Sequence, residues 1–186
     1  MRIGVRRAPQ LASLMALVLV LACGASSAPV TPIPPTSIPP TPSPTPIIGD
    51  ACLVGVWTLV YQQSDDLALD NATVALKGGA GATFTFTAAG TETQNWAISH
   101  PLLGSYQGHA VSVVERGTAE YTAQVVLGSI SENTTSVNLT GRVTLNGKTS
   151  TVTFGGVFNQ SGEKYTCAAH SLTINIPTGT TNVLQR

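Results

Sequence analysis

Charged residues are scarce in this chain, since Lys, Arg, Asp and Glu make up only 10% of its 186 residues. Three of the nine basic residues, Arg2, Arg6 and Arg7, lie at the extreme N-terminus, which leaves six basic and nine acidic residues for the rest of the chain. Contacts with a phosphate backbone need clustered Lys and Arg. Nothing in the composition therefore indicates nucleic-acid binding, and we predict no nucleic-acid partner.

The residue patterns of the common catalytic and metal sites are also missing. His100, His109 and His170 are scattered, without the His-Glu-x-x-His spacing that places two metal ligands on one helical face. The chain has no Gly-x-Ser-x-Gly nucleophile elbow, and the glycine-rich residues 78–81 lead into an expected strand instead of a phosphate-binding helix. We therefore predict no metal site, no cofactor and no enzymatic activity.

Residues 1–22 have the pattern of a secretory signal peptide. Three arginines precede Leu11–Ala22, a run of 12 residues that is apolar except for Ser13 and is too short to span a bilayer. The junction at residues 20–24, Val-Leu-Ala-Cys-Gly, resembles the lipobox of bacterial lipoproteins. The resemblance implies that Cys23 becomes the lipidated N-terminus and anchors the protein on the extracytoplasmic side of the membrane. An ordinary signal peptide followed by a chance cysteine is the alternative.

A proline-rich linker occupies residues 23–49. Its segment Ala28–Pro46 contains nine prolines, which remove backbone donors and favour extended polyproline II. At about 3.1 Å per residue, such a segment would hold a following domain on the order of 60 Å from the lipid. The foldable part of the chain is then one domain, residues 50–186.

Alternating apolar and polar residues predict an all-β domain. Period two runs through residues 53–61, and Asn146-Gly147 is a strong signal for a hairpin turn. About eight or nine antiparallel strands fit an up-and-down β-barrel or a β-sandwich, and we expect the barrel, since closure removes exposed edges. Within this meander, Arg116-Gly117 is expected to be a turn and residues 102–107 a loop.

One short helix is expected after the first strand. Ser64-Asp65-Asp66 resembles a helix start, and Leu69, Ala72 and Leu76 fall on one helical stripe that ends before Gly78-Gly79.

The cysteine count predicts one disulfide. If lipid modifies Cys23, Cys52 and Cys167 remain as a pair in an oxidising compartment. Two free thiols or a pair of metal ligands are the alternative, although no other His or Cys stands at ligand spacing to either.

The first strand resembles that of the lipocalin-like (calycin) barrels, which carry Gly-x-Trp there, as in Gly55-Val56-Trp57. The resemblance implies that Trp57 packs at the closed end of a barrel under an arginine near the last strand, for which Arg186 is the candidate. Cys52 to Trp57 and Tyr165-Thr166-Cys167 are also similar to secreted bacterial lipoprotein domains of this length.

A lipocalin-like barrel implies that the protein, as a monomer, binds a small apolar or amphipathic ligand. Barrels of about eight strands hold one small ligand or are filled by side chains. The alternative function is therefore that of a non-catalytic structural or interaction protein of the envelope with a filled barrel. The residues that would line the ligand site or fill the core are Trp57, Phe84, Phe86, Trp96, Tyr121 and Phe154.

Overall fold

The computed structural model describes residues 3–5, 50–154 and 159–186. Apart from residues 3–5, the expected signal peptide lies outside the described residues, as do Cys23 and nearly all of the linker. The described part of the chain is all-β and antiparallel, which confirms the predicted fold class at this level.

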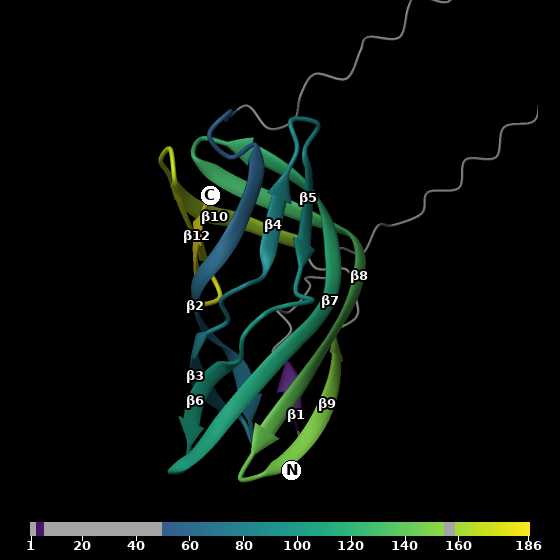
Figure 1. Ribbon diagram of the computed structural model, residues 1–186, viewed down its shortest axis with the longest axis vertical. Helices are drawn as coiled ribbons and strands as arrows, with labels where there is room; N and C mark the ends of the chain where they lie inside the picture. Colours follow the sequence, from purple (N-terminus) through teal and green to yellow (C-terminus); the bar gives the residue numbers. More distant parts are fainter. Residues whose placement is uncertain (1–2, 6–49, 155–158) are drawn as a thin grey trace, which may run out of the picture. The chain divides into compact units, whose positions relative to one another are not determined.

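One antiparallel sheet contains all the strands of the described residues (Figure 1). The strands are β1 (Ile3–Val5), β2 (Gly55–Leu69), β3 (Ala72–Gly78), β4 (Thr83–Phe86), β5 (Thr91–Asn95), β6 (Leu102–Tyr106), β7 (His109–Val126), β8 (Ser129–Leu145), β9 (Lys148–Phe154), β10 (Asn159–Cys167), β11 (Ser171–Ile176) and β12 (Thr180–Gln185).

Part of this sheet closes on itself as a ring of eight strands. In ring order these are β2, β4, β5, β7, β8, β10, β11 and β12. The ring closes where β12 pairs with β2, from Thr181 opposite Gln63 to Gln185 opposite Thr58. The C-terminal strand thus lies beside the first strand of the domain.

The rest of the sheet is open, so the domain is not a simple up-and-down barrel. The long strands β2, β7 and β8 leave the ring and continue as an open sheet, to which β3, β6 and β9 are added. β1 pairs with the end of β2, at residues 67–69. Each long strand thus pairs with different strands along its length. The sequence analysis expected a series of short strands and did not predict this arrangement.

The predicted helix between residues 64 and 77 is wrong, because these residues form the β2–β3 hairpin. Asp70 and Asn71 make the turn with φ of 47° and 67°, values that Asp and Asn tolerate better than most residues. Val74 and Leu76 then alternate inward with period two. The Asp-Asn turn signal outweighs the apparent helical stripe.

Two other local predictions need correction, whereas the Asn146-Gly147 turn is confirmed. Residues 102–107 are not a loop, since Leu102–Tyr106 form β6. Gly117 lies inside the continuous strand β7 with φ of 115°, and a Cβ atom there would clash with the carbonyl oxygen of Asn138. Glycine at this point allows β8 to approach β7 closely, and the chain does not reverse there.

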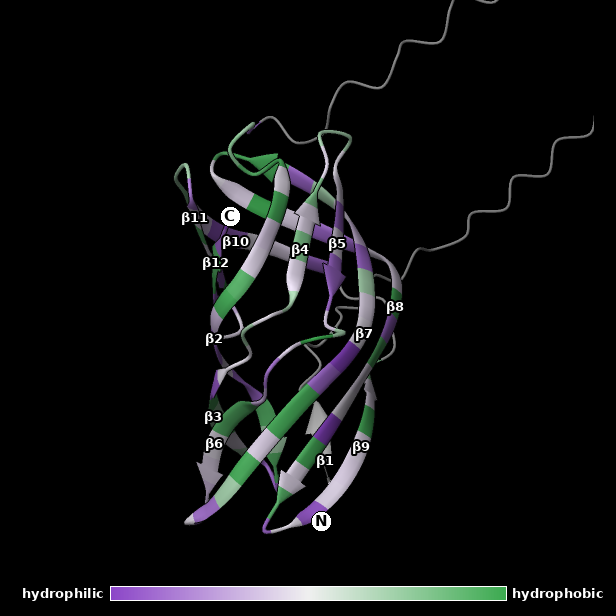
Figure 2. Ribbon diagram, viewed as in Figure 1, coloured by the Kyte–Doolittle hydropathy of each residue, from purple (hydrophilic) through white to green (hydrophobic). Residues whose placement is uncertain are grey.

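Two apolar cores follow from this division of the sheet. Along β7, apolar residues alternate with polar ones, and the inward set is buried (Figure 2). The core of the ring contains Trp57 and Phe84, whereas the core of the open sheet contains Leu76 and Val111.

Gly117→Ala is expected to destabilise the domain by about 2–4 kcal/mol, because the new Cβ meets backbone and the left-handed φ is strained. Gly108 has φ of 78°, but a Cβ atom added there would have no heavy atom within 4 Å. Gly108→Ala therefore isolates the backbone strain, at about 1 kcal/mol. Urea unfolding of both variants measures the difference. Equal losses would contradict the close approach of β7 and β8.

Candidate functional site

Four of the six predicted ligand-lining or core residues lie together in the ring. Trp57, Phe84, Phe86 and Trp96 belong to one core cluster, and each is at most 5% exposed. The rings of Phe84 and Trp96 pack edge to face with their centroids 5.7 Å apart. These residues form an aromatic core on the inner face of β2 and β4 and just beyond β5.

The other two predicted residues lie elsewhere. Tyr121 is buried on β7 and pairs in register with Glu92 of β5. Phe154 is half-buried at the end of β9 and covers Gly141 of β8, where a Cβ atom would lie 2.7 Å from the Phe154 ring. Phe154 is not a member of the aromatic core.

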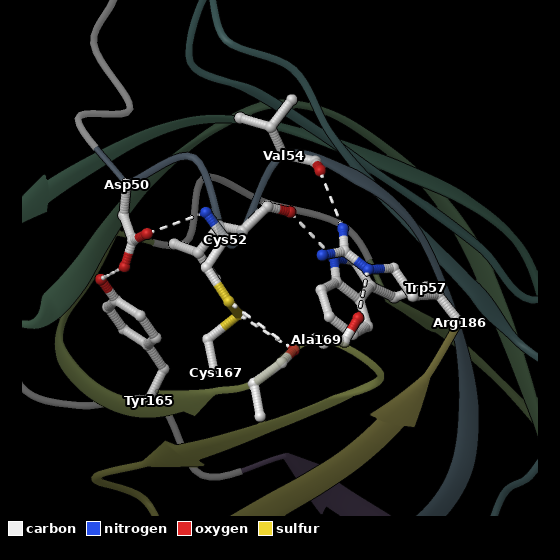
Figure 3. The surroundings of a disulfide bond; sticks show 10 residues. Asp50, Cys52, Val54, Trp57, Tyr165, Cys167, Ala169 and Arg186 are labelled. Atoms are coloured by element: carbon white, nitrogen blue, oxygen red, sulfur yellow. Dashed lines mark hydrogen bonds between the residues drawn. A yellow bond between two sulfur atoms is a disulfide. The ribbon is translucent and has the colours of Figure 1, made fainter.

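Trp57 and Arg186 meet at one end of the ring (Figure 3). The indole Nε1 of Trp57 donates a hydrogen bond to the carbonyl oxygen of Leu53, at 2.8 Å. The Arg186 guanidinium lies over the indole, 4.3 Å from its centroid, and donates to the carbonyl oxygens of Val54 and Ala169. This cation–π contact joins the last residue of the chain to the first strand of the ring.

A disulfide between Cys52 and Cys167 lies beside this contact, in agreement with the predicted pairing (Figure 3). Asp50 supports it from both sides, because its carboxylate accepts hydrogen bonds from the Cys52 amide at 2.9 Å and the Tyr165 hydroxyl at 2.6 Å. Burial and the bond to Asp50 raise the pKa of Tyr165 to about 12, which keeps the hydroxyl protonated as a donor.

Sequence reasoning missed three buried carboxyl groups inside the ring. Glu92 of β5, Glu132 of β8 and Glu163 of β10 are 0%, 4% and 2% exposed. We refer to them as the acidic cluster. Alternation could have revealed them, since Glu92 shares a face with Trp96, and Glu163 shares one with Tyr165.

Burial raises the pKa of every member of the acidic cluster. Desolvation is the largest cause for Glu92 and Glu132, whose carboxyl groups lie within hydrogen-bonding reach of each other. The pKa of Glu163 rises to about 8 through burial and the charge of Glu132. Tyr121 faces the same groups, and its pKa is also raised by burial and by their charges. Burial thus favours the protonated form of all three carboxyl groups, and with a pKa of about 8 Glu163 is largely protonated at pH 7.

Several buried side-chain atoms of the described residues have no hydrogen-bond partner. In the acidic cluster, Gln94 donates to Glu92 Oε1 at 2.8 Å and a proton on Glu132 can bond to Glu92, whereas Glu163 Oε1 is unpartnered. The side-chain oxygens of Gln62, Gln160 and Asn182 are also buried and unpartnered, and so is one donor, the indole Nε1 of Trp96 in the ring core. Leaving a buried polar atom unpaired costs roughly 1–3 kcal/mol, so these atoms need an explanation.

A second polar group lies where β2 leaves the ring. The Thr180 hydroxyl donates to Asp66 at 2.5 Å and lies 3.1 Å from the Ser64 hydroxyl, across a bulge in β2. Burial and the charge of Asp66 raise the pKa of Glu115 to about 7. Because Ser64, Asp66 and Thr180 satisfy one another by hydrogen bonds, this group has the character of a structural junction.

The histidines take no part in either group. His100, His109 and His170 are all exposed, and no three His, Cys, Asp or Glu side chains of the described residues are placed to hold a metal ion. Among the same residues, no helix has the length and apolar character needed to cross a membrane.

Comparisons of the chain with protein-family models, with curated proteins and with solved structures find no match.

Replacing both cysteines with serine, as Cys52→Ser/Cys167→Ser, is expected to lower the free energy of unfolding by about 4 kcal/mol, because the bond closes a loop of roughly 115 residues. Urea unfolding with and without reductant measures this. Reductant should destabilise the parent protein and leave the double variant unchanged. A parent protein insensitive to reductant would contradict the bond.

The raised pKa of Glu163 makes stability depend on pH. Its folded value of about 8 exceeds the usual 4.5, so the stability linked to its proton is complete below pH 4.5 and is lost as pH rises to about 8. The loss is on the order of 4 kcal/mol. The free energy of unfolding, measured across this pH range, should fall less steeply with rising pH in Glu163→Gln than in the parent protein. The exposed Glu120 provides the control, since Glu120→Gln should keep the parent slope.

Proposed function

We propose that this protein is a binding protein of the bacterial cell envelope, which takes a small amphipathic ligand into the eight-stranded ring. The observation that carries the proposal is the set of buried, unpartnered polar atoms on the inner face of a ring otherwise lined by apolar and aromatic side chains. Ligand sites combine these two features, with a mainly apolar lining and a few polar groups that orient the ligand.

The end of the ring at Trp57 supports a lipocalin-like barrel. The resemblance implies a Gly-x-Trp tryptophan on the first strand, covered by an arginine from near the last strand. Trp57 lies on β2, and Arg186 follows β12 and lies over the indole at 4.3 Å. In this proposal the ring corresponds to the lipocalin-like barrel, and the open sheet formed by β3, β6 and β9 is an addition to it.

The tether and the location are inferred from the N-terminal sequence. The lipobox-like residues 20–24 support lipidation at Cys23, and the linker at residues 23–49 would hold the domain away from the membrane. A disulfide between Cys52 and Cys167 fits an oxidising compartment outside the cytoplasm. We therefore propose an extracytoplasmic, membrane-anchored monomer.

One observation favours the alternative, a non-catalytic interaction protein with a filled ring. Trp57, Phe84 and Phe86 are each at most 1% exposed and pack in a single core, as side chains that fill a barrel do. The two functions differ in whether the ring admits a small molecule.

Titration of the full-length protein with the neutral, apolar dye N-phenyl-1-naphthylamine tests this difference. We expect saturable fluorescence enhancement with one site per chain. Ala123 is buried in the ring on β7, so Ala123→Leu should weaken dye binding by reducing the interior space. The control is Ala110→Leu, at an exposed position of the same strand.

Circular dichroism and non-reducing electrophoresis establish that both variants fold with their disulfide. No saturable dye binding by the folded parent protein would contradict a ligand-binding ring and favour the interaction protein. Equal binding by Ala123→Leu and Ala110→Leu would place the dye outside the ring.

A further inference from the structure

We infer that Asn71, in the turn between β2 and β3, is the acceptor of an N-linked oligosaccharide. The site belongs to the surface of the domain and not to the interior of the ring. It rests on the proposed extracytoplasmic location, because its sequence pattern is an acceptor in exported proteins, and it is independent of ligand binding by the ring.

The sequence of the turn is the first step. Residues 71–73 read Asn-Ala-Thr, which is the Asn-x-Ser/Thr acceptor pattern with a residue other than proline in the middle. Three more such triplets begin at Asn133, Asn138 and Asn159. Residues 50–186 contain eight asparagines, and 31 of these 137 residues are Ser or Thr, so chance would give about two triplets. The number of triplets alone therefore does not decide, and the surroundings of each asparagine must.

All four triplets lie on the surface of the domain. In each of them, both the asparagine and the hydroxyl residue two positions later are exposed. Side chains two positions apart share a face of a strand, so one enzyme can contact both. In contrast, Asn182, the buried asparagine among the described residues, is followed two positions later by Leu184 and has no acceptor pattern. Burial therefore excludes none of the four triplets.

The position in the sheet separates Asn71 from the other three asparagines. Asn133 lies inside β8 and pairs with β7 on one side and with Asn159 of β10 on the other. Asn138 is also inside β8 and pairs with β7. The backbone at these three positions is held in the hydrogen-bonded ladder, which limits the access of an enzyme to the triplet in the folded protein.

Asn71 lies outside the ladder. The pairing of β2 with β3 ends at Leu69 opposite Ala72. The two turn residues, Asp70 and Asn71, have φ of 47° and 67°, and both are exposed. A two-residue turn of this kind projects from the end of its hairpin, so the Asn71 amide can enter the active site of a transferase without unfolding of the sheet.

The turn also lies at the opposite end of β2 from the start of the domain. β2 begins at Gly55, five residues after Asp50, and its 15 residues end at Leu69. At about 3.3 Å per residue, the strand separates its two ends by up to about 45 Å. An oligosaccharide at Asn71 would therefore extend from the end of the open sheet and would not cover the ring.

The reaction joins Asn71 to a sugar supplied by a lipid-linked oligosaccharide pyrophosphate. The side-chain amide nitrogen of Asn71 forms a bond to the anomeric carbon of the sugar, and the bond from that carbon to the pyrophosphate oxygen breaks. The lipid pyrophosphate leaves with the electron pair, and the amide nitrogen releases one proton. The exposed Thr73 hydroxyl is the second group of the triplet that the transferase requires.

Mass spectrometry of the full-length protein, isolated from the envelope of the cells that make it naturally, tests the inference. We expect the proteolytic peptide that contains residues 71–73 to carry sugar residues on Asn71. In variants made in the same cells, Thr73→Ala should abolish the modification, and Thr73→Ser should retain it, because serine supplies the same hydroxyl. Thr73 is exposed and lies outside the two-residue turn, so both variants keep the turn residues.

Asn146 provides a matched control. It is also exposed and has positive φ, at 48°, in the two-residue turn between β8 and β9, but the residue two positions later is Lys148. Asn146 should therefore be unmodified in the parent protein. Lys148→Thr completes the acceptor pattern in an exposed turn and should lead to modification of Asn146.

The outcomes separate the glycan from the proposed function. No sugar on Asn71 in the parent protein, or sugar confined to the Ser and Thr residues of the linker, would overturn the site. Equal occupancy of Asn71, Asn133 and Asn138 would overturn the selection by the turn. Retention of the sugar in Thr73→Ala would overturn the acceptor pattern.

Two further measurements keep the ring and the location distinct from the glycan. Dye binding by Thr73→Ala should equal that of the parent protein, and a glycosylated protein that binds no dye would overturn only the ligand-binding ring. Cleavage of the domain by protease added to spheroplasts establishes the extracytoplasmic location. An unmodified Asn71 in a domain that is cleaved in this way would overturn the glycan and leave the location unchanged.

Discussion

The pairing of β12 with β2 is the constraint on which the rest of the domain depends. It closes eight strands into a ring, and it brings the last residue of the chain over the first strand, where Arg186 covers Trp57. The disulfide between Cys52 and Cys167 reinforces the same end of the ring. Without this closure, β2 and β12 would expose backbone donors and acceptors along their edges.

Closure also determines the chemistry of the interior. Inside a ring, the inward residue of every strand is removed from water, so a glutamate there keeps its proton at a pH at which an exposed glutamate is charged. Glu92, Glu132 and Glu163 come from three different strands, β5, β8 and β10, which the pairings of β7 with β5 and β8 and of β8 with β10 bring to one part of the ring.

Local signals in the sequence predict some features correctly and others wrongly. Asn146-Gly147 predicts a turn because both residues tolerate positive φ, whereas an apparent helical stripe conceals the Asp70-Asn71 turn. Gly117 resembles a turn residue, although it is a point of close approach between long strands. A glycine has the same appearance in the sequence in either role, and only the neighbouring strand distinguishes them.

The sequence by itself determined the all-β class and the alternation of inward and outward residues, because these depend on local periodicity. The residue count indicated Cys52 and Cys167 as a pair, but the disulfide itself is a property of the structure. Of the candidate site, it identified the aromatic core around Trp57 and Phe84 but not the acidic cluster. Only the tertiary structure decided which strands extend beyond the ring and which carboxyl groups lie together. Those properties depend on contacts between residues far apart in the chain, such as Glu92 with Glu132, which no local pattern records.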